Sequence, residues 1–248
     1  MKWRVIPLQT GDAFTNMAVD EAVCEAVAAG KSPPTVRFYT WKPSAVSIGY
    51  FQNLNDEVDV NVAKELSVDI VRRRTGGGAV YHDAKGEITY SVIAPESGMP
   101  SGIRESYQMI CGWITGSLKN LGIESEFKPI NDIIAGGKKI SGNAQTRRNG
   151  VLLQHGTLLY DLDVRTMFTL LKVPREKISD KMIQSVEERV TKVLNFGNFS
   201  VQDVYDSVLK GFTDGKDYEM GCLSEEEVYR AKELAEERYK TDEWNYRR

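Results

Sequence analysis

The chain has 248 residues, 41% of them hydrophobic, and a formal net charge of −3 at pH 7. This length and composition suffice for one folded domain with a sizeable core. The lack of bulk positive charge argues against a nucleic-acid-binding protein, and no apolar run approaches the roughly 20 residues of a membrane helix. The N-terminus lacks the apolar core of a secretory signal, so we expect a cytoplasmic protein that binds neither nucleic acid nor membrane.

Strand and helix patterns alternate through the first half of the chain. A helix is predicted over residues 15–29, with Thr15 as its N-cap and Gly30 as its end. Short runs of β-forming residues, bounded by turn residues, predict strands at 3–8, 35–41, 45–50, 68–73 and 88–94.

The second half begins with the apolar spacing of a helix over residues 102–121, which Gly122 ends. Two hairpin turns, Gly136-Gly137 and Asn149-Gly150, indicate antiparallel pairing of the strands around them. Those strands are predicted at 124–128, 132–135, 139–146 and 151–160. After Asp163 the chain is predicted to be mainly helical, most clearly at 203–212 and 224–239, with a capping box from Ser224 to Glu227.

One short stretch combines cations with glycines. Arg72, Arg73 and Arg74 lead into Thr75 and then into three glycines at 76–78. Glycine lets the backbone approach a ligand and expose its N–H groups, and guanidinium groups suit phosphate or carboxylate. The stretch therefore predicts an anion-binding loop. Strand alternation predicts that Arg73 faces opposite to its two neighbours.

Two further motifs accompany this loop. Residues 131–145 place small residues around Lys138 and Lys139, and residues 153–159 contain His155, one of two histidines in the chain. Together, RRxxGGGxVxHD (72–83), GxKIxGxA (137–144) and HGTLL (155–159) resemble the lipoate–protein ligase family. The resemblance covers residues 3 to 165 through motifs, and more loosely the helical remainder.

The resemblance implies a fold and a domain organisation. The expected fold is α+β, with a mixed, largely antiparallel sheet flanked by helices, as in biotin ligases and class II aminoacyl-tRNA synthetase cores. We expect residues 1–248 to form a single catalytic domain, with 163–248 as its mainly helical C-terminal part.

The implied activity is an ATP-dependent, adenylate-forming lipoate–protein ligase. Such an enzyme converts lipoate and ATP to lipoyl-AMP and passes the lipoyl group to a lysine of a lipoyl domain. ATP and Mg²⁺ are the implied cofactors, with lipoate as substrate. The implied acceptors are the E2 subunit of a 2-oxoacid dehydrogenase and the glycine-cleavage H protein.

Residue roles follow from the matching motifs. Lys139 is the expected central cation, since both steps develop negative charge on oxygen. The expected binding residues for ATP and lipoyl-AMP are Arg73, Gly76, Gly77, Gly78, Ala79, Val80, Tyr81, Asn131, Asp132 and Lys139. Asp132 is also a possible magnesium ligand. Residues expected to shape the pocket are Arg72, Gly49, His82, His155, Gly156 and Thr157. The segment 47–53 resembles the wall of an acyl tunnel, although core packing explains Ile48 and Phe51 equally well.

Three alternatives stay open. Octanoyltransferases of this fold hold the acyl group as a cysteine thioester, which requires an accessible, activated thiol near the pocket. Cys24 and Cys111 fall in predicted helices and Cys222 lies beyond the motifs; none forms a CxxC pair, so we expect free thiols and favour adenylation. A non-catalytic subunit that binds lipoyl domains is the second alternative. Biotin ligation is remote, because a GRGRxxR-type loop is missing.

The chain departs from many family members in one respect. From the short stretch after its helical tail, we expect this chain not to include their small C-terminal domain. We therefore expect a separate small accessory subunit to be needed for efficient activity.

Overall fold

The computed structural model describes residues 1–172 and 188–247. Within these ranges an eight-stranded sheet has the order β11-β1-β2-β6-β10-β9-β8-β7, and a three-stranded sheet has the order β4-β3-β5. The strands of the large sheet are β1 (Trp3–Gly11), β2 (Thr35–Trp41), β6 (Glu87–Pro95), β7 (Ser125–Lys128), β8 (Asp132–Ala135), β9 (Lys138–Arg148), β10 (Val151–Leu159) and β11 (Tyr218–Met220). Those of the small sheet are β3 (Ala45–Ile48), β4 (Asp69–Arg72) and β5 (Val80–His82).

The predicted fold class is confirmed. In the large sheet β1 pairs in parallel with β2 and β11, whereas the other pairs are antiparallel. Glycines with positive φ at 136 and 137 connect β8 to β9, and the turn from β9 to β10 has positive φ at Asn149 and Gly150. These are the two hairpins that the sequence predicts, because such turns require left-handed backbone conformations.

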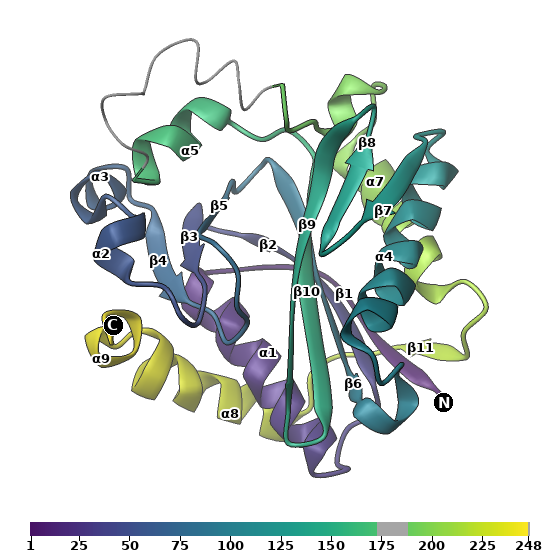
Figure 1. Ribbon diagram of the computed structural model, residues 1–248. Coiled ribbons are helices and arrows are strands. Elements are labelled where there is room, and N and C mark those ends of the chain that lie inside the picture. The colour runs from purple at the N-terminus through teal and green to yellow at the C-terminus, as the bar shows by residue number, and fades with distance from the viewer. Residues whose placement is uncertain (173–187, 248) are drawn as a thin grey trace.

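Helices cover both faces of the large sheet (Figure 1). On one face α1 (Ala13–Ala28) packs beside α8 (Glu225–Leu234), and on the other α4 (Ile103–Asn120) packs beside α7 (Val201–Thr213). Short helices α2 (Leu54–Glu57), α3 (Val60–Glu65), α5 (Val164–Leu170) and α9 (Asp242–Asn245) complete the described helices, with 3₁₀ turns at Glu96–Gly98 and Val193–Asn195 and a π-helical turn at Ala235–Tyr239. Among the described residues, no helix is long and apolar enough to cross a membrane.

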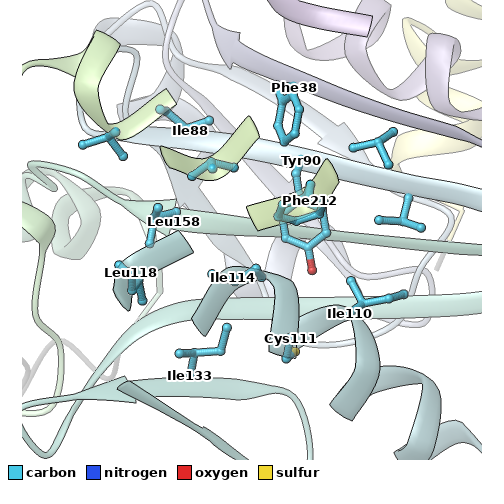
Figure 2. Packing of buried hydrophobic residues seen from close by; sticks show 14 of the residues in the cluster. Phe38, Ile88, Tyr90, Ile110, Cys111, Ile114, Leu118, Ile133, Leu158 and Phe212 are labelled. Carbon is cyan, nitrogen blue, oxygen red and sulfur yellow. The ribbon is translucent and has the colours of Figure 1, made fainter. Parts of the chain in front are cut away.

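Each sheet face has its own core. Figure 2 shows Phe38 and Tyr90 of the sheet meeting Phe212 of α7, with Ile110 and Ile114 of α4 beside them. A second cluster joins α1 and α8 to the opposite face, and a third packs the small sheet against α2, α3 and α5. The small sheet thereby faces the end of the large sheet where β10 finishes.

Several boundaries differ from the prediction. Helix α1 begins two residues earlier than expected, because the Asp12 carboxylate accepts from Thr15 N at 2.7 Å and is the N-cap in place of Thr15. The strand predicted at 45–50 ends at Ile48, and the one predicted at 68–73 ends at Arg72. The capping box at Ser224 is confirmed, since its side chain and that of Glu227 bond each other's backbone N–H. Of the C-terminal part predicted to be mainly helical, residues 173–187 and 248 lie outside the described residues.

Candidate functional site

A cavity of about 310 Å³ lies where the small sheet and the loop after β4 face the large sheet. Its floor includes a row of four residues in register across four neighbouring strands. Gly142 of β9 pairs with Thr157 of β10, Thr157 with Thr89 of β6, and Thr89 with Tyr39 of β2. Since strands lie about 4.8 Å apart, this row spans roughly 14 Å. The cavity is therefore long enough for an extended ligand.

The walls of the cavity are largely apolar. The apolar side chains come from α1, β2, β10, the region of α5 and the segment that bridges to β9 at Lys139, namely Met17, Trp41, Leu159, Leu162, Met167, Leu171 and Val190. Polar groups enter at Lys139, Asn131 and Asn143, all on or beside β8 and β9. An apolar body with a few polar groups is the usual composition of a small-molecule site.

Most of the predicted site residues line this cavity. They are Arg73, Gly77, Gly78, Ala79, Val80, Tyr81, His82, Asn131, Lys139, His155, Gly156 and Thr157. Four predicted site residues do not line the cavity: Gly49, Arg72, Gly76 and Asp132. Gly49, Gly76 and Asp132 each contact a residue that does, namely Gly77, Arg73 and Lys139. The three sequence motifs therefore converge in one place, as the spacing alone could not have established.

Lys139 stands on β9 beside the cavity. Its Nζ lies 2.7 Å from Asp132 Oδ1 on the neighbouring strand β8. Its side chain passes over Gly142, where an added Cβ would lie 2.8 Å from Lys139 Cε and 2.9 Å from Nζ. The backbone is fixed as well, since Lys139 N donates to Arg189 O and Lys139 O accepts from Thr191 N, both at 2.8 Å. The ammonium group is therefore held at the side of the cavity that β9 lines.

Arg73 is buried, and its N–H groups donate to other groups of the protein. Its Nε–H donates to Thr75 Oγ1 at 3.1 Å, and NH1 donates to Ser47 O at 3.0 Å and Ser47 Oγ at 3.1 Å. NH2 donates to the carbonyls of Gly76 and Gly78, each at 2.7 Å. Burial lowers the pKa of Arg73 to about 10. Guanidinium has five N–H donors, and Arg73 uses all of them within the protein: two on carbonyls of the glycine loop, one on Thr75 and two on Ser47 of β3.

The two histidines lie on either side of Arg73. His82 Nε2 is 2.8 Å from Ser47 Oγ and its Nδ1 is 2.7 Å from Glu87 Oε1, while its ring stacks on Trp41. His155 Nε2 is 2.6 Å from Thr75 Oγ1, and its Nδ1 is 3.2 Å from Asp20 Oδ2. Both rings are buried, have a partner at each nitrogen and line the cavity; their role in shaping a ligand pocket stays a prediction.

Charge inside this network is balanced by burial and hydrogen bonding. Burial lowers the pKa of His155, against the opposing effect of Asp20. Burial by itself would raise the pKa of Asp20, but the Arg37 charge together with hydrogen bonds from His155 and Ser91 lowers it. The carboxylate is therefore ionised near neutral pH and His155 is neutral.

Arg72 and Arg74 point away from the cavity, as strand alternation predicts. Arg72 NH2 donates to Asn245 O at 2.7 Å, and NH1 donates to Gln52 O at 2.6 Å, so it ties α9 to the segment after β3. Arg74 pairs with Glu21 of α1. Gly49 shapes the site through contact, because a Cβ there would lie 2.0 Å from Gly77 O.

Sequence reasoning missed part of the wall. Met17, Trp41 and Asn143 line the cavity, although Met17 has the spacing of an ordinary core residue on its helix. Phe51, for which a tunnel wall and core packing were both considered, is 66% exposed and neither lines the cavity nor packs in the core. The sequence offered a signal for Asn143, which lies within the GxKIxGxA motif. In the structure its Nδ2 donates to Asn131 O at 2.8 Å.

No cysteine lines the cavity as described. Cys111 lies in the core between α4 and the sheet (Figure 2), where burial raises its pKa to about 12. Burial also raises the pKa of Cys24, and Cys222 is exposed beyond α7. All three are free thiols, as predicted. Among the described residues, no group of three or more His, Cys, Asp or Glu side chains could hold a metal ion, and Asp132 as a magnesium ligand stays a prediction.

Comparison with known proteins identifies the relatives of the chain. Residues 12–213 match the lipoyl protein ligase A/B catalytic domain. Octanoyltransferase LipM of Brevibacillus brevis is 38% identical, covering 100% of this chain and 99% of its own. Octanoyltransferase LipM of Bacillus subtilis is 34% identical, covering 99% of this chain and 98% of its own.

Solved structures agree with the fold. The bi-partite lipoate protein ligase of Thermoplasma acidophilum, solved in a study that includes its E2 lipoyl domain, superposes with a TM-score of 0.90 at 33% identity, over 99% of this chain and 96% of that one. A lipoate-protein ligase A bound with ATP gives a TM-score of 0.86 at 32% identity, over 99% of each chain.

These relatives correct one expectation. The prediction of an ATP-dependent, adenylate-forming ligase is wrong, because the relatives that match the whole chain at 34–38% identity are octanoyltransferases, which act by acyl transfer. The preference for adenylation rested on the lack of a suitably placed cysteine. That observation concerns where an acyl group is attached to the enzyme; it does not show whether ATP activates the acid.

Proposed function

The chain belongs to the lipoyl protein ligase A/B family, and from this premise we propose that it is an acyltransferase that moves an octanoyl-class group from a thioester donor to a lysine of a lipoyl-domain protein. The observation that carries the proposal is the four-residue row from Gly142 to Tyr39, an extended cavity floor with Lys139 at one end. Full-length similarity to octanoyltransferases supports the same acyl class.

The acyl chain occupies the apolar part of the cavity in this proposal. Met17 and Trp41 lie toward β2, whereas Lys139 and Asn143 lie toward β9. An acyl chain laid across the strands places its tail between the apolar walls and its carbonyl beside the ammonium group. Burial of such a chain contributes about 0.8 kcal/mol for each methylene removed from water, so the walls favour a hydrocarbon over a polar ligand.

Transfer is an aminolysis of the thioester. The acceptor lysine amine attacks the acyl carbonyl, an N–C bond forms, and the C–S bond breaks. The nitrogen loses a proton and the departing thiolate gains one, so an amide and a thiol result. Negative charge develops on the carbonyl oxygen as the amine attacks. In this proposal the Lys139 ammonium, which lines the cavity, stabilises that charge.

An acyl intermediate on the chain itself is not part of this proposal. A cysteine nucleophile needs an accessible thiolate, and burial raises the pKa of both Cys24 and Cys111. Cys222 is exposed but does not line the cavity. The acyl group therefore passes directly from donor to acceptor while Lys139 and the glycine loop hold it.

Other expectations remain predictions. Thioester aminolysis consumes neither ATP nor Mg²⁺, so the proposed reaction needs neither. One solved relative is bound with ATP, and another, from Thermoplasma acidophilum, is bound with lipoic acid. The accessory subunit also stays a prediction, for which the bi-partite ligase is the precedent. Lipoyl-domain proteins, such as a dehydrogenase E2 subunit or a glycine-cleavage H protein, are the acceptors we propose.

The test is mass spectrometry of a lipoyl domain incubated with the protein and an octanoyl thioester, without nucleotide. We expect the acceptor to gain one octanoyl group at a single lysine. A lipoyl thioester in a parallel reaction measures the preference between the two acyl groups. No acylation from either thioester, with acylation from the free acid once ATP is added, would contradict the proposal.

A further inference from the structure

Two hydroxyl groups connect Arg73 to the two buried histidines. Ser47 Oγ lies 3.1 Å from Arg73 NH1 and 2.8 Å from His82 Nε2. Thr75 Oγ1 lies 3.1 Å from Arg73 Nε and 2.6 Å from His155 Nε2. Each hydroxyl is therefore bonded on one side to the arginine and on the other to a histidine, although Ser47 and Thr75 come from different segments.

Donor balance fixes the direction of the hydrogen bonds made by the arginine and by the carboxylates in these chains. Guanidinium only donates, so each hydroxyl oxygen accepts from Arg73 and its own hydrogen is left for the histidine. A carboxylate only accepts, so each Nδ1 carries a hydrogen and donates it, to Glu87 from His82 and to Asp20 from His155. Burial lowers the pKa of His155, so its Nε2 is unprotonated near neutral pH and accepts from the Thr75 hydroxyl. The two chains thus connect the same kinds of group in the same order, from arginine through hydroxyl and imidazole to acid.

We propose that Ser47 and Thr75 are positioning residues, whose hydroxyls fix Arg73 and, through Arg73, hold the glycine loop in the shape that lines the cavity. Loss of either hydroxyl removes an acceptor of an Arg73 N–H in a buried setting and leaves a histidine nitrogen without its hydrogen-bond partner. An unpaired buried polar group is costly, so Arg73 and the loop shift to recover partners.

The loop matters because Arg73 sets the direction of its peptide groups. NH2 of Arg73 binds the carbonyls of Gly76 and Gly78. In a trans peptide the N–H points opposite to the carbonyl, so the N–H groups of Gly77 and Ala79 point away from Arg73. Gly77, Gly78 and Ala79 all line the cavity. Fixing Arg73 therefore fixes which loop amides can meet a ligand there.

The effect on acyl transfer rests on the proposed function, but the effect on the loop does not. The experiment therefore has two readouts: hydrogen exchange of the amides over residues 74–80 in the unliganded protein, and the rate of octanoyl transfer. The variants are Thr75→Val, which keeps the shape but loses the hydroxyl, Thr75→Ser, which keeps the hydroxyl, and Ser47→Ala.

Matched controls remove hydroxyls that bond backbone carbonyls far from the loop. They are Thr213→Val, whose Oγ1 donates to Leu209 O, and Ser207→Ala, whose Oγ donates to Ser117 O. We expect Thr75→Val and Ser47→Ala to speed exchange in the loop and to lower the transfer rate constant about 10- to 100-fold, the scale of small misplacements in a site. Thr75→Ser should restore both, and the controls should change neither.

The readouts separate two kinds of failure. Loop exchange in Thr75→Val and Ser47→Ala that stays at the level of the controls would overturn the positioning role, whatever the transfer rate. Faster loop exchange in a protein that transfers no acyl group in any form would support the positioning role and contradict the proposed function. If Thr75→Val fails to fold, loop exchange in Thr75→Ser and Ser47→Ala decides the question.

Discussion

The Nζ of Lys139 and Oδ1 of Asp132 form a 2.7 Å ion pair between the adjacent strands β9 and β8, at the side of the cavity that β9 lines. Both side chains keep about a third of their surface exposed, so the pair adds little to stability. Its consequence is geometric. The acid holds the ammonium group on the cavity side of β9, where a carbonyl oxygen can reach it.

Replacing Lys139 by alanine should abolish most activity and leave the fold intact. We expect Lys139→Ala to lower the rate constant of octanoyl transfer by roughly 10²- to 10³-fold, the usual effect of removing one group that stabilises an oxyanion. The free energy of unfolding should change by only about 0.5 kcal/mol, since the side chain is partly exposed. Lys138→Ala is the matched control, because Lys138 does not line the cavity; an equal loss in both variants would argue against a specific role for Lys139.

Gly142→Ala should separate activity from stability. The added Cβ would clash with Cε and Nζ of Lys139, the mobile end of a long side chain, and would be in ordinary contact with Asp132 Oδ1 at 4.0 Å. We expect the side chain to swing aside at little cost in unfolding free energy, while octanoyl transfer slows. Urea denaturation and transfer assays on the same preparation measure both. Full activity in Gly142→Ala would mean that the position of Lys139 over this glycine is unimportant.

Gly49→Ala should destabilise the fold, unlike Gly142→Ala, because its Cβ would lie 2.0 Å from a backbone atom, Gly77 O. A backbone clash in a packed region cannot be relieved by a side-chain rotation, so we expect a loss of about 1–3 kcal/mol in unfolding free energy. At Gly76 an added Cβ has nothing within 4 Å and the φ is not positive, so Gly76→Ala controls for alanine in this loop. Equal stability of the two variants would refute the predicted clash.

Acidification should weaken the fold through His155. Burial lowers its pKa from the ordinary value of 6.5, so below that pH the unfolded chain binds a proton that the folded chain resists. Stability is therefore complete above about pH 6.5 and falls as the pH drops toward the folded-state pKa. Asp20, whose pKa is lowered from 3.8, adds a further loss at more acidic pH.

The groups that face His155 are Asp20 of α1, Arg73 of the glycine loop and His82 of β5, with Arg37 of β2 bonded to Asp20. Urea midpoints measured between about pH 7.5 and pH 5.5 should fall for the native chain and fall less for His155→Gln, which cannot titrate in this range. Parallel curves for the two proteins would show that His155 does not couple protonation to folding.

Local sequence signals predicted the elements that carry strong periodicity or turn chemistry. The spacing of Ile110, Ile114 and Leu118 locates α4, and the glycine and Asn149-Gly150 turns locate the β8–β9–β10 meander. Strand β11 escaped prediction because it has only three residues and all three are exposed. Helix α1 began early because Asp12 competes with Thr15 as a cap, and both residue types suit that position.

The site was predictable where one motif holds the information and not where distant segments meet. Lys139 and the glycine loop were found from their neighbours in sequence. The contact of His155 with Thr75 joins residues 80 positions apart, and no local pattern encodes it. Met17 and Trp41 were missed for a related reason, since an apolar residue that walls a cavity has the same sequence pattern as one that fills a core.

The most direct test of the central claim is the intact mass of both proteins, quenched during a single turnover with octanoyl thioester and a lipoyl domain in nucleotide-free buffer. Direct transfer predicts octanoyl on the acceptor lysine at every time point and none on the chain itself. An octanoyl thioester on Cys24, Cys111 or Cys222 that forms and decays as the acceptor is acylated would contradict direct transfer, and an acceptor that stays unmodified until ATP is supplied would contradict the acyltransferase account.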